Sequence, residues 1–303
     1  MPQVGFICPD KGLTTFEECF KKCRLGERCV SMPVLFMLSN QRIWTGLPST
    51  TQLLNGTRQA LLKITKNYHE DIQKMAWVIL GNKGHKSLED ADTGGTSEIA
   101  FKNKVQSGIA DYYESSTRTL WDRKVSGAFK VHKALGMVKK KIIDPSGAKY
   151  KRSGNGFKAG DPKKIDYWYM DPKTADKWDW TLQTNRYSIW LDDTNRPVER
   201  IKIEVIVRDG GLKNAAMYGI YRNIIIIDIP ILNREYVLDY YNRKAKMLRT
   251  SLALSWAPKC SKEECWDGRK CEGYCPVRDH CEEMTDNHPA KERFESMRPE
   301  ILC

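Results

Sequence analysis

Apolar residues recur at helical spacing, every three or four positions, in several parts of the chain. The first of these segments follows Ser49 and Thr50, whose hydroxyl groups are typical helix caps. A helix that follows Gly127 and a Trp-rich helix in the second half of the chain show the same spacing. The spacing predicts helices over residues 58–68, 71–80, 85–91, 128–138, 174–191 and 233–252.

Runs of alternating and β-branched residues predict four strands between these helices. Residues 105–113 and 119–124 form a predicted hairpin through the polar connection 114–118, and residues 199–208 and 223–229 form a second pair. Two glycines predict a loop over 92–97, and the Lys-, Gly- and Ser-rich segment 139–164 predicts a mobile basic loop. The order of elements predicts a mixed α/β (α+β) domain with cysteine modules at its ends.

The charge balance favours a polyanionic partner. The chain of 303 residues has 50 Lys and Arg against 38 Asp and Glu, a net charge of +12, so nucleic acid is the first candidate and a basic protein without such a partner is the alternative. No apolar run approaches the roughly 20 residues that span a bilayer. The N-terminus lacks the pattern of a signal peptide, so we expect neither a membrane protein nor a Sec-exported one, but a protein of the reducing cytoplasm.

The cysteines form two clusters with one spacing. Cys8, Cys19, Cys23 and Cys29 read C-x10-C-x3-C-x5-C, and Cys260, Cys271, Cys275 and Cys281 repeat that pattern near the other end. Four thiolates can hold Zn²⁺ or a [4Fe–4S] cluster, and isolated free cysteines are the alternative. Zinc sites usually contain a C-x2-C pair, which is missing here. Cys265 and Cys303 are predicted to be spare thiols.

Three charged residues on the first predicted hairpin suggest a catalytic site. Asp122 and Lys124 are two positions apart on one strand and therefore share a face, and Asp111 lies on the neighbouring strand. Two neighbouring carboxylates favour a bound Mg²⁺ or Mn²⁺, and a lysine beside them can orient a water molecule and neutralise charge on a phosphate. The alternative is a solvated hairpin face with three unrelated charges.

Further motifs give these residues a context. Gly84-His85 precedes Asp111, and Gln183-x3-Tyr187 lies on a predicted helix after Lys124. In order, G-H, G-x-x-D, D-x-K and Q-x3-Y resemble the motifs of the RecB-like branch of the PD-(D/E)XK nuclease superfamily, over residues 48–229. The resemblance implies a restriction-endonuclease-like core, a mixed central sheet flanked by helices. It divides the chain into residues 1–47, 48–254 and 255–303, with cysteine-rich metal modules at both ends.

The resemblance also implies a role for each motif residue. His85, Asp111 and Asp122 would bind Mg²⁺ or Mn²⁺, helped by the backbone carbonyl of Arg123, and Lys124 would position the attacking water. Gln183 and Tyr187 would hold the DNA backbone or support Lys124. The family usually has Glu where this chain has Asp122.

Iron–sulfur members of the branch, such as AddB-type and CRISPR-associated exonucleases, carry a [4Fe–4S] cluster on cysteines that flank the core, with zinc as the alternative here. Cys271, Cys275 and Cys281 resemble the rear part of that motif, and either Cys260 or an N-terminal cysteine, Cys23 or Cys29, completes it. The implied partners are DNA ends or single strands and a helicase or recombination protein.

Basic residues near the predicted site are candidates for contact with nucleic acid. Cations of the basic segment and of the predicted Trp-rich helix would meet phosphates, and the helix cap would bind phosphate at its positive end. These candidates are Lys139, Lys140, Lys141, Lys151, Arg152, Arg186, Ser49 and Thr50. A solvated charge run and simple capping are the alternatives. The sequence thus predicts a metal-dependent deoxyribonuclease, with a non-catalytic nucleic-acid-binding module and, less favoured, a redox protein as competing hypotheses.

Overall fold

This computed structural model describes residues 3–9, 12–21, 23, 28–40, 43–76, 78–79, 81, 94–285 and 288–297. The chain divides into two compact units. The first unit comprises residues 1–121, 182–201 and 230–303, and the second comprises residues 122–181 and 202–229. Both cysteine segments therefore belong to the first unit, together with helices from the middle of the chain. Helices accompany a sheet with parallel and antiparallel strands, so the predicted mixed α/β class is confirmed.

The first unit begins with a three-stranded sheet in the order β2-β1-β3. Its strands are β1 (Gln3–Cys8), β2 (Gly12–Thr15) and β3 (Tyr68–Asp71). The pairing of β1 with β2 is antiparallel and its pairing with β3 is parallel. Helices α1 (Phe16–Lys21) and α2 (Met32–Ser39) accompany this sheet, and Phe6, Leu35 and Leu38 are buried in the cluster between them.

The strand β3 corrects a prediction from the sequence. A helix was predicted over residues 71–80, whereas Asp71 is the last residue of β3 and residues 72–75 form a turn; residues 76, 78, 79 and 81 are helical, so the prediction is wrong only for its first part. The partner of β3 is β1, more than 60 residues earlier in the chain. Local spacing cannot reveal such a long-range pairing, which overrides the helical pattern.

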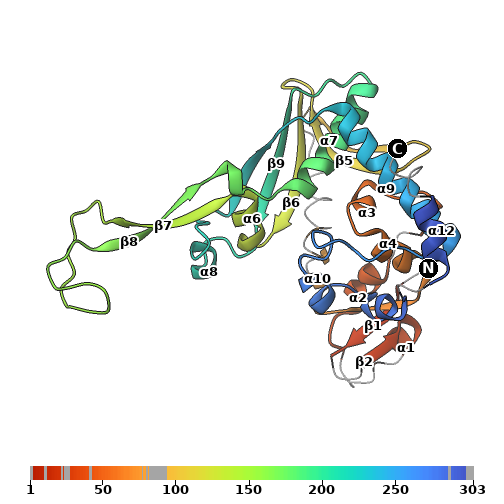
Figure 1. Cartoon of the computed structure of the whole chain (residues 1–303), viewed down its shortest axis with the longest axis horizontal. Coiled ribbons are helices and arrows are strands. Elements are labelled where there is room, and N and C mark those ends of the chain that lie inside the picture. Colours follow the sequence, from red (N-terminus) through yellow and green to blue (C-terminus); the bar gives the residue numbers. More distant parts are fainter. Residues whose placement is uncertain are drawn as a thin grey trace. The chain divides into compact units, whose positions relative to one another are not determined.

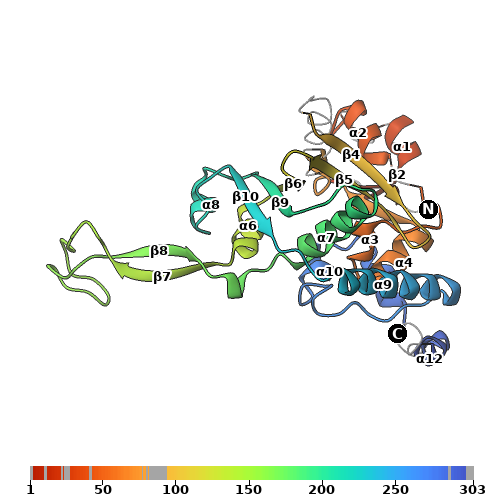
Figure 2. The same cartoon turned by 90° about the horizontal axis from the view of Figure 1, so that it is seen from above.

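A second core of the first unit lies among helices. The helix α3 (Thr50–Leu53) begins with a capping box, α4 (Thr57–Thr65) follows it, and both lie beside the long helix α9 (Arg234–Leu254) (Figure 2). Leu53, Leu61, Val237, Tyr241 and Leu248 are buried in their shared cluster. These helices confirm the predictions of a helix after Ser49 and of a long helix near residue 233.

An antiparallel ladder completes the first unit. β4 (Thr96–Lys102) pairs with β5 (Ser107–Glu114), which pairs with the start of β6 (Thr119–Ser126) through Tyr112 opposite Trp121 and Glu114 opposite Thr119. The predicted hairpin is thereby confirmed. β4 was not predicted, because its first residues lie in a segment whose glycines suggested a loop. The unit also holds most of α7 (Trp178–Asp193) and the short helices α10 (Arg269–Gly273), α11 (Arg278–Glu283) and α12 (Ala290–Ser296).

The second unit contains the remainder of β6, followed in the sheet by β9 (Arg200–Val207) and β10 (Ile224–Ile229). The helix α6 (Ala128–Leu135) ends at Gly136, which adopts a left-handed conformation with φ of 64°. The short helix α8 (Lys213–Ala216) and a 3₁₀ turn, η1 (Pro172–Thr174), complete the unit. The strands that the sequence predicts over 199–208 and 223–229 are confirmed by β9 and β10.

A long β-hairpin also belongs to the second unit. β7 (Met137–Ile143) pairs with β8 (Lys164–Met170) in one unbroken antiparallel register, and the two strands run side by side in both views (Figures 1 and 2). The prediction of a mobile loop over 139–164 is wrong for its ends, because β7 and β8 pair there, with Val138 opposite Tyr169, Lys140 opposite Tyr167 and Ile142 opposite Ile165. Hydrogen bonds also order the connection: Lys163 donates its backbone N–H to Ala148 at 2.8 Å.

Among the described helices, none combines the length and the apolar character that crossing a membrane requires.

Candidate functional site

Asp122 and Lys124 of the D-x-K motif meet on β6. The Lys124 Nζ lies 2.8 Å from Asp122 Oδ2, and Asp122 is completely buried whereas the Lys124 side chain is 23 % exposed. This ion pair confirms that the two side chains share one face of the strand. Arg123, between them in sequence, pairs instead with Glu204 of β9, its Nε lying 3.5 Å from Oε2. Because Asp122 is buried, its negative charge must be compensated within the protein, and the Lys124 ammonium provides that compensation.

The other predicted metal ligands are placed as follows. Asp111 lies on β5, half-buried, and belongs to the first unit, whereas Asp122 and Lys124 belong to the second. The sharing of one ion by the two aspartates therefore stays a prediction. His85 lies outside the described residues.

Residues of three sequence motifs come together in the first unit around Gly108. A Cβ added to Gly108 would lie 2.7 Å from Thr50 Oγ1, 2.8 Å from Tyr187 Cε1 and 2.8 Å from Trp190 Cζ3. Only a glycine permits this approach, which packs the start of β5 against α7 and the first residue of α3. The G-x-x-D motif therefore contributes its glycine to packing and leaves Asp111 three residues further along the strand.

Gln183 and Tyr187 form a polar pair one turn apart on α7. The Gln183 amide donates a hydrogen bond to the Tyr187 hydroxyl oxygen at 3.1 Å, and both side chains are buried. The sequence predicted that they share one face of the helix, and this contact confirms it. The hydrogen bond holds the Tyr187 ring against Gly108, so the pair packs against the start of β5. Its predicted role in holding DNA stays a prediction.

Ser49 and Thr50 are explained by local structure. The Ser49 hydroxyl accepts a hydrogen bond from the Gln52 backbone N–H at 3.1 Å, and the Ser49 N–H donates to the Gln52 side chain, which completes a capping box. Thr50 is fully buried and donates its hydroxyl to the Ser107 carbonyl at 3.2 Å. Their contact with nucleic acid stays a prediction, and the helix that they begin has only four residues.

Arg186 of α7 lies inside the first unit. Its guanidinium carbon stands 3.9 Å from the centre of the Trp190 ring, and only 3 % of its surface is exposed. Burial lowers the pKa of the guanidinium to about 10, although Tyr241 and Asp193 act in the opposite direction. The geometry gives Arg186 a packing role through cation–π contact, and its predicted contact with nucleic acid stays a prediction.

The other predicted nucleic-acid-binding cations all lie on the hairpin of the second unit. Lys139, Lys140, Lys141, Lys151 and Arg152 are exposed. Between residues 137 and 170 the chain has nine lysines and arginines and three aspartates, a net charge of +6, half of the total of +12. The sequence revealed these cations, but Tyr167 and Tyr169 were not predicted, although the alternation of tyrosine and tryptophan over 167–169 was the available signal.

The rear cysteines surround one cavity of the first unit, about 460 Å³ in volume. The lining includes Cys260, Cys271, Cys275 and Cys281, and also Cys265, which the sequence suggested to be a spare thiol and which donates a hydrogen bond to the Lys262 carbonyl at 3.6 Å. None of the four front cysteines lines this cavity. Within the described part of the chain, no group of three or more His, Cys, Asp or Glu residues is placed so that it could hold a metal ion.

The thiols of the cavity influence one another's pKa. Burial raises the pKa of the Cys271 thiol, and the neighbouring thiols of Cys265, Cys275 and Cys281 raise it further. Thiolates gathered in this way repel one another, and a bound cation relieves that repulsion. Thiols are donors that Zn²⁺ and iron–sulfur clusters accept, and the predicted metal group at these cysteines stays a prediction.

Cys260 is held against the start of α4. A Cβ on Gly56 would lie 2.2 Å from the Cys260 Sγ, so the sulfur occupies the space that a side chain would need. Burial raises the pKa of the Cys260 thiol to about 11, and a hydrogen bond from the Gln59 backbone N–H acts in the opposite direction. The glycine thus sets the position of one predicted ligand, an effect that the sequence did not reveal.

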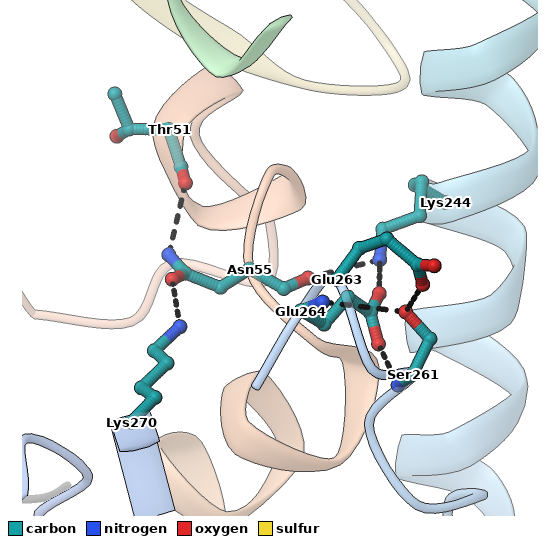
Figure 3. A network of polar contacts seen from close by, with 7 residues as sticks. All are labelled: Thr51, Asn55, Lys244, Ser261, Glu263, Glu264 and Lys270. Carbon is teal, nitrogen blue, oxygen red and sulfur yellow. Dashed lines mark hydrogen bonds and ion pairs between the residues drawn. The ribbon is translucent and has the colours of Figure 1, made fainter. Parts of the chain in front are cut away.

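A network of polar side chains ties the rear cysteine segment to the helices α3 and α9 and to Asn55, which follows α3 (Figure 3). The Lys244 ammonium donates to the Asn55 carbonyl at 2.9 Å and to Glu264 Oε1 at 2.6 Å, and the Lys270 ammonium donates to Asn55 Oδ1 at 2.9 Å. Glu264 in turn accepts from the Ser261 backbone N–H at 2.9 Å. Since Ser261 follows Cys260, the network fixes the backbone at the first cysteine of the rear cluster.

The front cysteines are also neighbours in the first unit. Burial raises the pKa of the Cys19 thiol, and Cys29, Cys23 and Cys8 add to that effect, whereas Arg28 opposes it. The Arg28 guanidinium also donates to the Cys19 and Phe20 carbonyls at 2.7 and 2.9 Å. The four thiols that share the sequence pattern thus lie near one another, and their predicted metal stays a prediction.

Comparison with known proteins found no family model, no curated protein and no solved structure that matches this chain.

Proposed function

We propose that this protein is a divalent-metal-dependent DNA nuclease that acts on DNA ends or single strands. The observation that carries the proposal is the ion pair of Asp122 and Lys124 at 2.8 Å on β6, the strand on which the sequence predicts a D-x-K motif. A fully buried aspartate is costly to maintain for stability alone, because replacement of a buried ion pair by apolar residues is often neutral or stabilising.

The strand register and the packing at Gly108 support the proposal. Tyr112 of β5 pairs with Trp121 of β6, and Asp111 and Asp122 are the residues next to that pair along their strands. Gly108 and Tyr187, from two other motifs of the resemblance, are in close contact within the first unit. The contact of Gly108 with Tyr187, which are 79 positions apart in the sequence, supports the proposal.

Each residue has a chemical role in this proposal. When bound, a divalent ion lowers the pKa of a coordinated water and neutralises charge on the scissile phosphate. Asp111, Asp122 and His85 would hold that ion, and Lys124 would orient the water and stabilise the negative charge that develops on the phosphate. Gln183 keeps the Tyr187 ring in place through their hydrogen bond.

The rear thiols have a structural role in the proposal. Cys260, Cys271, Cys275 and Cys281 would hold a [4Fe–4S] cluster or Zn²⁺, with Cys265 as an additional thiol at the same cavity. Such a group would fasten the end of the chain to α4, because Cys260 lies against the first turn of that helix. The front cysteines would hold a second group of the same chemistry.

Cleavage of end-labelled DNA in Mg²⁺ or Mn²⁺ tests the nuclease proposal. We expect Asp122→Asn, and the double variant Asp122→Asn with Lys124→Met, to lower the cleavage rate at least about 100-fold. The double variant removes both charges, so it avoids the unpaired buried carboxylate that Lys124→Met alone would leave. Glu204→Gln is the matched control, since it removes the partner of Arg123 on the neighbouring strand and leaves the D-x-K face intact.

Two outcomes would contradict the proposal. If the wild-type chain cleaves no DNA with either ion but still binds it, the protein is a non-catalytic nucleic-acid-binding module. If the Asp122 variants cleave as fast as the wild type and Glu204→Gln, the D-x-K residues are not the catalytic ones. Circular dichroism of each variant checks that the fold is kept.

A further inference from the structure

The hairpin of the second unit presents two different faces. Residues directly opposite each other in an antiparallel pair share a face, so Lys140 with Tyr167 and Val138 with Tyr169 lie on one side. Lys139 with Trp168 lies on the other side. We call the first side the tyrosine face, defined by Val138, Lys140, Tyr167 and Tyr169.

The tryptophan side is used for anchoring. The Trp168 ring meets the His132 ring edge-on at 5.5 Å between centroids, and a Cβ on Gly219 would lie 2.7 Å from Trp168. Backbone hydrogen bonds secure the base of the hairpin as well, with the Asp171 N–H donating to the Gly136 carbonyl at 2.8 Å. Trp168 is therefore a packing residue of the second unit rather than a platform for bases.

The tyrosine face is left to solvent. Tyr167 is 46 % exposed and Tyr169 is 37 % exposed, and the ammonium of Lys140 stands 5.5 and 5.0 Å from the centres of their rings. Residues two apart on a strand are separated by about 6.8 Å, so each ring can meet its own base along an extended single strand. Exposed aromatic rings on a sheet, interleaved with cations, are the usual platform for unpaired bases.

We propose that the tyrosine face binds single-stranded DNA, with bases stacked on Tyr167 and Tyr169 and the backbone phosphates neutralised by Lys140 and the neighbouring cations of the hairpin. A base that stacks on a ring displaces the Lys140 ammonium, which then meets a phosphate. The net charge of +6 between residues 137 and 170 complements the polyanion. Duplex DNA hides the faces of its bases, so the rings select single strands. The identity of the polymer as DNA rests on the proposed function.

Fluorescence anisotropy of a labelled oligo(dT) strand, with the full-length protein in buffer without divalent cations, measures this binding directly. We expect Tyr167→Leu combined with Tyr169→Leu to weaken binding at least about 10-fold, because stacking on each ring is lost. Tyr167→Phe with Tyr169→Phe keeps the rings and should retain wild-type affinity. Tyr221→Leu is the matched control, an exposed tyrosine of the same unit outside the hairpin, and should also bind as the wild type does.

A charge variant tests the cation of the same face. Lys140→Gln should reduce the slope of log affinity against log salt concentration by about 0.7, the value for one phosphate contact on a single strand. An unchanged slope would show that Lys140 does not contact a phosphate of the bound strand.

Other results would overturn the inference. Equal affinity of the leucine double variant and the wild type for the single strand would show that the rings do not stack on bases. Equal affinity of the wild type for the single strand and for duplex DNA of the same length would show that the protein recognises only the charge of the phosphates. Displacement of the strand by poly-glutamate, with no effect of the leucine variants, would indicate an acidic protein as the partner. If the leucine double variant loses strand binding and the wild-type protein cleaves no DNA, this inference is supported and the nuclease proposal fails. If the leucine double variant binds as the wild type does and Asp122→Asn loses cleavage, the nuclease proposal is supported and this inference fails.

Discussion

At the scale of single residues, two glycines set the positions of the proposed functional groups. Gly108 lets Tyr187 and Thr50 approach β5, and Gly56 lets the Cys260 sulfur lie against the start of α4. Neither glycine needs a left-handed backbone, because Gly56 has φ of −59° and neither is among the positive-φ residues. Their importance is therefore the absence of a side chain, and an added methyl group tests it without changing backbone preference.

We expect Gly108→Ala to lower the free energy of unfolding by about 1–3 kcal/mol, the usual cost of forcing a methyl group into a packed interior. The three side chains in its way, those of Thr50, Tyr187 and Trp190, are all buried. Urea denaturation measures the change. Gly273→Ala is the control, because nothing lies within 4 Å of its added Cβ, and it should not lower the stability. Equal stability of both variants would contradict the close packing of the motifs.

Gly56→Ala should weaken metal binding by the rear thiols. The new methyl group would displace the Cys260 sulfur, and disturbance of the support of a ligand typically costs 10–100-fold in metal affinity, so we expect a loss of at least about 10-fold. Competition with a chelator, read as iron or zinc per chain, measures this. Cys260→Ala should show a similar or larger loss and Gly273→Ala none. Full metal retention in both Gly56→Ala and Cys260→Ala would exclude Cys260 as a ligand.

At the scale of elements, the sequence predicted what depends on local chemistry. The capping box at Ser49, the hairpin of β5 and β6, and the shared face of Gln183 and Tyr187 all follow from short spacings, and all are present. The pairing of β1 with β3 and the full length of the β7–β8 hairpin were not predicted, because each depends on a partner that is distant in sequence.

The candidate site shows the same division. The side-chain contact of Asp122 with Lys124 could be predicted, since residues i and i+2 of a strand share a face. The contact of Gly108 with Tyr187 and the place of Cys265 in the thiol cavity could not, because they depend on how helices pack against strands and loops. Tyr167 and Tyr169 were missed because they directly follow the lysine-rich segment 139–164, whose composition predicted a loop rather than a strand pair.

At the scale of the whole molecule, the candidate functional residues are divided between two units. The first unit holds both cysteine clusters, Asp111 and the Gln183–Tyr187 pair, and the second holds Asp122, Lys124 and the basic hairpin. β6 belongs to both units and carries Leu120 and Trp121 in the first and Asp122 in the second. The central claim of the proposed function is that Asp111 and Asp122, from β5 and β6, bind one divalent ion.

Titration of Mn²⁺ into the metal-depleted protein, followed by electron paramagnetic resonance, tests that claim most directly. If the two carboxylates share one ion, Asp111→Asn and Asp122→Asn should each weaken the same Mn²⁺ site at least about 10-fold, and Glu204→Gln should leave it unchanged. Wild-type Mn²⁺ affinity in either aspartate variant would contradict a shared site, and with it the proposed nuclease.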